Sequence, residues 1–130
     1  MYKFGSRSKR CLNTVDHRLR ELCDEVIKHY DFSVIEGYRS VTRQKIMFDK
    51  GLSKIDGISR KGNHNFTPSR AMDLIPYKRG HNPFDGSEKS ELMFYRLNRE
   101  FQRASRKLGI PITWGGTWNN PRDYPHYELA

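Results

Sequence analysis

An aspartate inside an apolar run is the feature that most constrains this chain. Asp73 follows Ala71–Met72 and precedes Leu74–Tyr77, a stretch that has the composition of a buried strand. Burying a carboxylate is costly unless a partner neutralises its charge, and a metal ion is one such partner. The sequence therefore predicts a cationic neighbour for Asp73 in the folded protein.

Two histidines complete a candidate metal site. His64 precedes Asp73 across a short polar turn, and His126 lies in the last segment of the chain. Two neutral histidines, one carboxylate and an open fourth position form the ligand set of a catalytic zinc ion. A single histidine is more often a structural or surface residue, and this spacing matches no standard metal motif. From the residues alone, zinc at these three positions is a hypothesis.

Two acids near His126 are candidates for a catalytic base. Glu128 is two residues away and would share a face with His126 in a regular strand. Asp123 is three residues away, but a bend at Pro125 would bring it back toward the metal. The spacing leaves both acids open.

Apolar residues at intervals of three and four predict two long amphipathic helices. The first covers about residues 9–29, with Ser8 as its N-cap. The second ends at Leu108 and begins after a capping serine, Ser87 or Ser90. Aromatic and β-branched runs predict strands, and the remaining expected elements are a strand over 31–39, a short helix over 42–49, and strands over 71–77, 112–114 and 126–129.

This order predicts one α+β domain over residues 1–130. The expected architecture is a small antiparallel sheet packed against two long helices and a short one, with the zinc site in a cleft on the sheet. The loop over 51–63 leads into His64 and is a candidate gating segment. His81, between glycine and Asn82–Pro83, is expected to be exposed.

The net charge favours anionic partners. The chain has 24 Lys and Arg against 15 Asp and Glu, a formal charge of +9, which suits nucleic acid, a membrane surface or a polyanionic cell envelope. The basic residues are scattered, so the signature of a basic tail is missing. A nucleic-acid-binding module with an incidental histidine pair stays open as an alternative.

The expected location is the cytoplasm on synthesis. The sequence holds no run of the roughly 20 apolar residues that a transmembrane helix needs, and its first residues lack the apolar core of a signal peptide. Cys11 and Cys23 are twelve residues apart on one expected helix, about 18 Å along its axis. They are too distant for a disulfide and are expected to be ordinary thiols.

The chain resembles the zinc peptidases that cut bacterial cell-wall stem peptides, namely D-alanyl-D-alanine carboxypeptidases and phage L-alanyl-D-glutamate endopeptidases. Their pattern is S-x-H-x-x-G-x-A-x-D, followed much later by an acid three residues before a final histidine. His64, Ala71 and Asp73 match the first part, and Asp123 and His126 match the second. The resemblance implies that His64, Asp73 and His126 bind Zn²⁺ and that Asp123 is the base.

The chain departs from this pattern in its first part. Gly62 stands where the family has Ser, and Ser69 stands where it has Gly. The interval between the histidine and the aspartate is also two residues longer, through Thr67–Pro68. The resulting form, H-N-x-T-P-S-x-A-x-D, resembles a phage branch of the family.

Further segments carry the resemblance. Glu36–Ser40 is similar to the family's G-Y-R-[ST] segment, which implies that Arg39 binds substrate and stabilises the oxyanion. Gln44 falls at a recurring position. The W-G-G-x-W segment, which begins at Trp114, resembles the Gly-Trp segment before the last ligand. Gln44 and Trp114 are expected to contact substrate.

The resemblance implies a monomeric phage endolysin that hydrolyses peptidoglycan, with the L-alanyl-D-glutamate bond as the leading candidate. The alternative is a D-alanyl-D-alanine carboxypeptidase of the same fold. Such an enzyme would wait in the host cytoplasm until a holin opened the membrane. No separate wall-binding domain, no nucleic-acid partner and no stable membrane association are expected.

Overall fold

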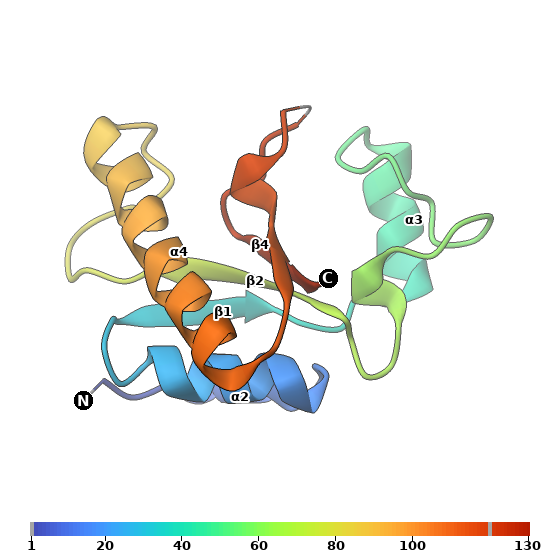
Figure 1. The fold of residues 1–130 in the computed structure, drawn as a ribbon. Coiled ribbons are helices and arrows are strands. Elements are labelled where there is room, and N and C mark those ends of the chain that lie inside the picture. The colour runs from blue at the N-terminus through green and yellow to red at the C-terminus, as the bar shows by residue number, and fades with distance from the viewer. Residues whose placement is uncertain (1, 120) are drawn as a thin grey trace.

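The computed structural model describes residues 2–119 and 121–130, which form an α+β fold around one antiparallel sheet (Figure 1). The strand order is β1-β2-β4-β3, and each neighbouring pair is antiparallel. This confirms the expected fold class. In chain order the elements are α1 (Ser6–Leu12), α2 (His17–Val26), β1 (Phe32–Glu36), α3 (Val41–Asp49), the 3₁₀ turn η1 (Asn63–Asn65), β2 (Ala71–Pro76), α4 (Glu88–Leu108), β3 (Ile112–Trp114), the 3₁₀ turn η2 (Gly115–Thr117) and β4 (His126–Leu129).

The two central strands separate a core face from a polar face. On β2, Met72 and Leu74 are fully buried, and Asp73 between them projects from the opposite face. On β4, the buried Tyr127 lies between His126 and Glu128 in the same way. Helix α4 packs against β2 and β3, and α2 packs against α4. Figure 1 shows β4 between α4 on one side and α3 on the other.

The helix predicted over 9–29 is instead two helices, α1 and α2. Val15, in the connection between them, forms a parallel bridge with Ser69. Asp16 then caps α2, because its Oδ1 accepts a hydrogen bond of 2.9 Å from the backbone N–H of Arg18. Val15 is buried, as are Leu12 before it and Leu19 after it. The three-to-four-residue spacing of apolar residues therefore continues through the connection between α1 and α2, where the helix is interrupted. Tertiary pairing, which local periodicity does not encode, ends the first helix.

Other N-terminal details also differ from expectation. Gly5, and not Ser8, is the N-cap of α1. Ser8 is buried, and its Oγ accepts a 3.0 Å hydrogen bond from the backbone N–H of Val34, which ties α1 to β1. Cys11 and Cys23 are both free thiols, as expected, although they lie on different helices.

Helix α4 begins after a capping serine and ends at a glycine, as its sequence predicts. The Ser87 side chain caps it by accepting from the Ser90 backbone, and Gly109 ends it with φ of 68°. Ser90 lies inside the helix, and its buried hydroxyl donates to Asp85 and lies 2.7 Å from His81 Nε2. The expectation that His81 is exposed was therefore wrong, since its side chain is 15% exposed. Neither α4 nor any other helix of the described residues is long and apolar enough to cross a membrane.

The Asp16 cap yields a stability prediction. Replacing Asp16 by Ala should lower the free energy of unfolding by about 1 kcal/mol at neutral pH, whereas Asp16→Asn keeps the cap acceptor but loses the charge that faces Arg18 and should lose part of this. Chemical denaturation of the three proteins measures this. Equal stabilities for wild type and Asp16→Ala would show that the cap contributes nothing.

The same cap predicts a pH dependence. The Arg18 side chain, opposed by burial, lowers the pKa of Asp16 from 3.8 to about 2. Because the folded pKa lies below the unfolded one, the extra stability of the wild type over the Asp16→Asn variant is fully present above about pH 4. This difference should disappear as the pH falls toward 2, and denaturation of the two proteins across that range measures it.

Candidate metal centre and active site

The register of the sheet brings Asp73 and His126 together. They are Cα partners across β2 and β4, and directly opposed residues project from the same face. Asp73 Oδ1 lies 3.4 Å from His126 Nδ1 and 3.4 Å from His64 Nε2, which η1 supplies. The candidate ligand atoms of the three residues all lie within 4.8 Å of one another. The three residues predicted as zinc ligands thus form one cluster.

The polar atoms of this cluster fit a metal ion. His64 Nε2 and Asp73 Oδ1 are buried and have no hydrogen-bond partner among the described residues. Leaving such atoms unpaired costs about 1–3 kcal/mol each, so they indicate a missing partner. Ligand atoms 2.0–2.1 Å from a tetrahedral zinc ion are about 3.3 Å apart, close to the two separations of 3.4 Å.

Each histidine is oriented through its other ring nitrogen. His64 Nδ1 lies 2.7 Å from the carbonyl oxygen of Gly37. His126 Nε2 lies 2.7 Å from Glu128 Oε1, and the other oxygen of Glu128 accepts a 2.7 Å hydrogen bond from Asn63. Acceptors of this kind fix the tautomer and turn the free nitrogen toward a metal. Glu128, one of the two acids left open by spacing, is thus engaged in holding His126.

The cluster is built to stabilise positive charge. Burial raises the pKa of Asp73, but the two histidines outweigh burial and hold that pKa well below its usual range. Burial lowers the pKa of His126, but the nearby Asp73 carboxylate and the hydrogen bond with Glu128 outweigh burial and raise that pKa to about 9. The same carboxylates that favour a proton here favour a metal cation.

Asp123, the other candidate base, is fixed beside this cluster. Its backbone N–H donates to Gly115 at 2.9 Å, and its carbonyl accepts from the His126 N–H at 3.2 Å. Burial is the main cause that raises the pKa of the Asp123 carboxyl, and the negative charge of Asp73 adds to it. A carboxylate with a raised pKa beside a metal site is suited to accept a proton.

Arg39 connects the cluster of His64, Asp73 and His126 to α3. Its side chain is 11% exposed, and its Nη2 lies 3.7 Å from Asp73 Oδ2. Its Nε donates to Glu36, and its Nη1 donates to Gln44 Oε1 at 3.0 Å. The amide nitrogen of Gln44 in turn donates to Ser53 at 2.7 Å and to the Ile55 carbonyl at 2.8 Å. Gln44 is 2% exposed. Through these hydrogen bonds its buried side chain joins Arg39 to the loop over 51–63.

The sequence of this chain also matches a known protein family. The sequence signature of the family described as phage L-alanyl-D-glutamate peptidase matches residues 1–129. The chain belongs to this family.

Individual relatives agree with the family match. The chain is 29% identical to the L-alanyl-D-glutamate peptidase of Escherichia phage T5, over 98% of this chain and 89% of that protein. It is 26% identical to the Bacillus subtilis peptidoglycan L-alanyl-D-glutamate endopeptidase CwlK, over 78% of this chain and 62% of that protein.

Solved structures share the fold. The Serratia marcescens L-Ala D-Glu endopeptidase ChiX has a TM-score of 0.81 and 27% identity, with 98% of this chain and 90% of that chain covered. The vancomycin-resistance D,D-dipeptidase VanXYg has a TM-score of 0.50 and 16% identity, with 87% and 47% covered, and shows likeness of fold alone.

The two tryptophans of the W-G-G-x-W segment have different surroundings. Trp114 is 4% exposed and packs against Tyr127 on the core side, and its indole N–H donates to the Tyr124 carbonyl. That position gives no support to the predicted substrate contact. Trp118 is partly buried, and its ring centre lies 4.9 Å from that of His126. Trp118 is therefore an aromatic residue that contacts the candidate metal site through His126.

The longer interval between His64 and Asp73 forms a turn outside the cluster. Thr67 and Pro68 are exposed and joined by a cis peptide bond. The next residue, Ser69, is fully buried, and its N–H donates to the Thr14 carbonyl at 2.9 Å. The turn packs on the connection between α1 and α2, so the extra residues leave the ligand atoms together.

Several residues of the site gave no clear signal in the sequence. Gly37 acts through its carbonyl oxygen, which any residue type carries, and Asn63 acts on His126 only through Glu128. Glu36 holds Arg39 from three residues away, and that spacing in a strand-to-loop segment indicates no contact by itself. The G-Y-R resemblance marked the region without revealing these contacts.

The orienting role of Glu128 predicts a loss of metal affinity. Glu128→Gln should weaken zinc binding about 10–100-fold, as is typical when the acceptor of a ligating histidine is removed. Competition with a chelator of known affinity measures this. Glu100→Gln, on α4 and paired with Arg103, is the matched control and should bind zinc as the wild type does. Equal affinity in Glu128→Gln would contradict the role.

Proposed function

We propose that this protein is a zinc-dependent hydrolase of bacterial peptidoglycan that cleaves the L-alanyl-D-glutamate bond of stem peptides. The observation that carries the proposal is the pair of buried, unpartnered atoms, His64 Nε2 and Asp73 Oδ1, beside His126. The family and its relatives supply the substrate class. His64, Asp73 and His126 would hold the ion, which when bound supplies a Lewis acid that polarises a carbonyl and acidifies water.

Asp123 moves the proton in this scheme. Its carboxylate accepts a proton from the attacking water and passes it to the nitrogen of the departing D-glutamyl residue as the amide bond breaks. The raised pKa of Asp123 supports this role, because the carboxyl holds the proton more readily than an exposed aspartate does. Glu128 stays bound to His126 and Asn63 throughout.

Arg39 stabilises the charge that develops on the carbonyl oxygen. A guanidinium has five N–H donors, of which Nε and one Nη1 hydrogen donate to Glu36 and Gln44 among the described residues. The remaining donors on the two Nη atoms, of which Nη2 also lies 3.7 Å from Asp73 Oδ2, would serve the substrate. Gln44 acts by positioning Arg39, and direct substrate binding by Gln44 or Trp114 stays a prediction. A preorganised donor of this kind contributes about 10²–10³-fold to the rate.

The biological setting we infer is host lysis by a phage. The relative from phage T5 and the family description support an endolysin. A charge of +9 suits a polyanionic envelope. The protein would act as a monomer, remain in the host cytoplasm after synthesis and reach the wall once a holin opens the membrane.

Digestion of purified sacculi tests the bond that is cut. Mass analysis should find muropeptides that end at L-alanine and released peptides that begin with D-glutamate. Removal of the metal with a chelator should abolish this release, and added zinc should restore it. Loss of a terminal D-alanine alone would instead support a carboxypeptidase. Salt-sensitive binding to DNA without any hydrolysis would support the nucleic-acid-binding alternative.

Substitution of Asp123 tests the base. Asp123→Asn should lower kcat on sacculi by about 10²–10⁴-fold, the usual contribution of a general base, while its zinc content stays at the wild-type level. Glu128→Gln, assayed at saturating zinc, should recover most of its activity. Full activity in Asp123→Asn together with an inactive, zinc-loaded Glu128→Gln would assign the base to Glu128.

A further inference from the structure

A cavity of about 320 Å³ adjoins the candidate base. It lies between the start of α4, the loop before that helix and the segment that leads into β4. Its volume is in the range of pockets that bind small molecules. Asp123 lines it, and the Asp123 carbonyl oxygen accepts a 3.2 Å hydrogen bond from the backbone N–H of His126. The cavity is therefore next to the reacting centre, although it contains none of the three metal ligands.

Aromatic rings give this cavity rigid walls. Phe94 stacks on Tyr124 with ring centres 5.6 Å apart, and Phe84 lies 6.0 Å from Phe94. The Tyr124 hydroxyl donates a 3.0 Å hydrogen bond to Glu91, which fixes the ring to α4. Phe84 is 58% exposed, so the cavity opens toward solvent at that side.

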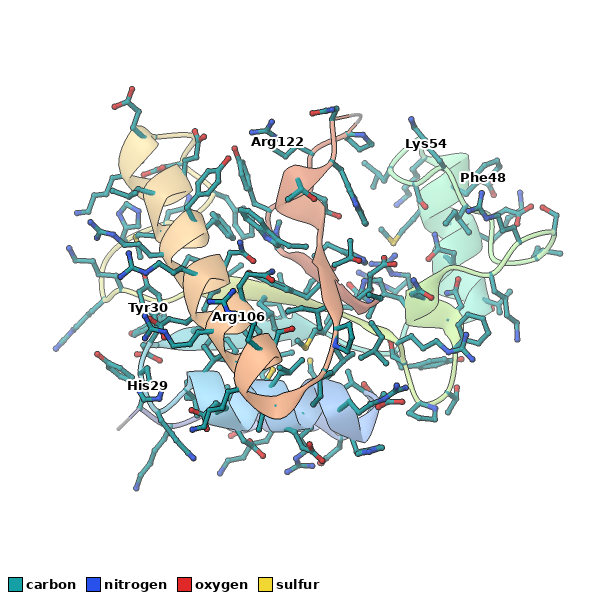
Figure 2. The ribbon with its side chains drawn as sticks, in the orientation of Figure 1. His29, Tyr30, Phe48, Lys54, Arg106 and Arg122 are labelled. Carbon is teal, nitrogen blue, oxygen red and sulfur yellow. The ribbon has the colours of Figure 1, made fainter. Side chains whose placement is uncertain are left out.

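Arg122 is the cationic side chain among the described residues that line the cavity. Its Nη1 donates to the hydroxyls of Tyr95 and Tyr124 at 3.4 and 3.3 Å, and its guanidinium lies 5.8 Å from the Tyr124 ring centre. The described residues place no carboxylate oxygen within 4.0 Å of it. Figure 2 shows Arg122 near the outer end of the segment before β4.

We propose that this cavity binds the leaving D-glutamyl residue and that Arg122 pairs with its free α-carboxylate. This inference rests on the proposed function. Asp123 delivers its proton to the leaving nitrogen, so the leaving residue must lie beside Asp123. In a stem peptide the D-glutamyl residue continues through its γ-carboxyl, and its α-carboxylate stays on the carbon that bears the leaving nitrogen. The residue adjacent to the base, Arg122, is placed to meet that group.

The two other carboxylates of the lining are consistent with this assignment. Asp123 faces the leaving nitrogen, and Glu91 is engaged by the Tyr124 hydroxyl. A guanidinium recognises a carboxylate through paired N–H donors and opposite charge, whereas a carboxamide is neutral and offers a single acceptor oxygen. Arg122 would thus make the enzyme distinguish a D-glutamyl residue from its α-amidated form.

A pair of synthetic stem peptides tests the assignment. They are identical except that one carries the D-glutamyl α-carboxylate and the other its carboxamide. Wild type should cleave the carboxylate peptide with a kcat/KM about fivefold higher, the upper range for a solvent-accessible ion pair, mainly through a lower KM. Arg122→Gln should cleave the two peptides equally, and Arg122→Lys should keep part of the preference.

A control variant and an unfolding measurement distinguish failure of the Arg122 assignment from failure of the proposed function. Arg103→Gln removes an exposed arginine of α4 that pairs with Glu100 and should keep the wild-type preference. Thermal unfolding of each variant checks that the fold is intact. Absence of preference in wild type, or an undiminished preference in Arg122→Gln, would overturn the role of Arg122 while leaving the proposed function standing. If wild type cuts neither peptide at this bond, the proposed function is wrong and the inference fails with it.

Discussion

The carboxylate of Asp73 is the group on which the whole site depends. Its Oδ1 faces His64 and His126 at 3.4 Å, and its Oδ2 lies 3.7 Å from the Arg39 guanidinium. One acid on a central strand therefore links His64 and His126 to Arg39. A largely buried charge is tolerated only with such partners, and removing one of them leaves it uncompensated. Asp73 is thus compatible with its apolar strand because the Arg39 guanidinium and the rings of His64 and His126 surround its carboxylate.

The pairing register of the strands sets the positions of these side chains. Glu36, Asp73 and His126 are successive Cα partners across β1, β2 and β4, and a register shift between the buried Val34 and Glu36 lets Glu36 join this polar row. The other face of the same strands carries Met72, Leu74 and Tyr127, which are buried in the core. A slip of one residue would exchange the two faces. Burial of the core therefore also enforces the alignment of Asp73 with His126.

Much of this arrangement could be predicted from local sequence, and the exceptions share one cause. Helix α4, the strands and the clustering of His64, Asp73 and His126 are predictable because periodicity, caps and residue chemistry are local signals. The break at Val15 was missed because it depends on pairing with Ser69, which is distant in the chain. The sequence predicts substrate contact for Trp114, whereas Trp118 is the ring that lies beside His126, because sequence does not reveal which of two nearby aromatic rings faces the core. Contacts made through the backbone, such as that of Gly37, leave no side-chain signature at all.

Two motif glycines show how backbone packing supports the chemistry. A Cβ on Gly37 would meet the Cys11 carbonyl oxygen at 2.7 Å, and one on Gly115 would meet the Asp123 backbone and lie 3.0 Å from the His126 Cβ. Neither glycine has a positive φ, so close approach, and not a left-handed conformation, excludes a side chain at these positions. The carbonyl of Gly37 holds His64, and that of Gly115 holds the N–H of Asp123. A methyl group at either position would therefore displace a carbonyl that holds His64 or Asp123, so the geometry of the site depends on these two residues having no side chain.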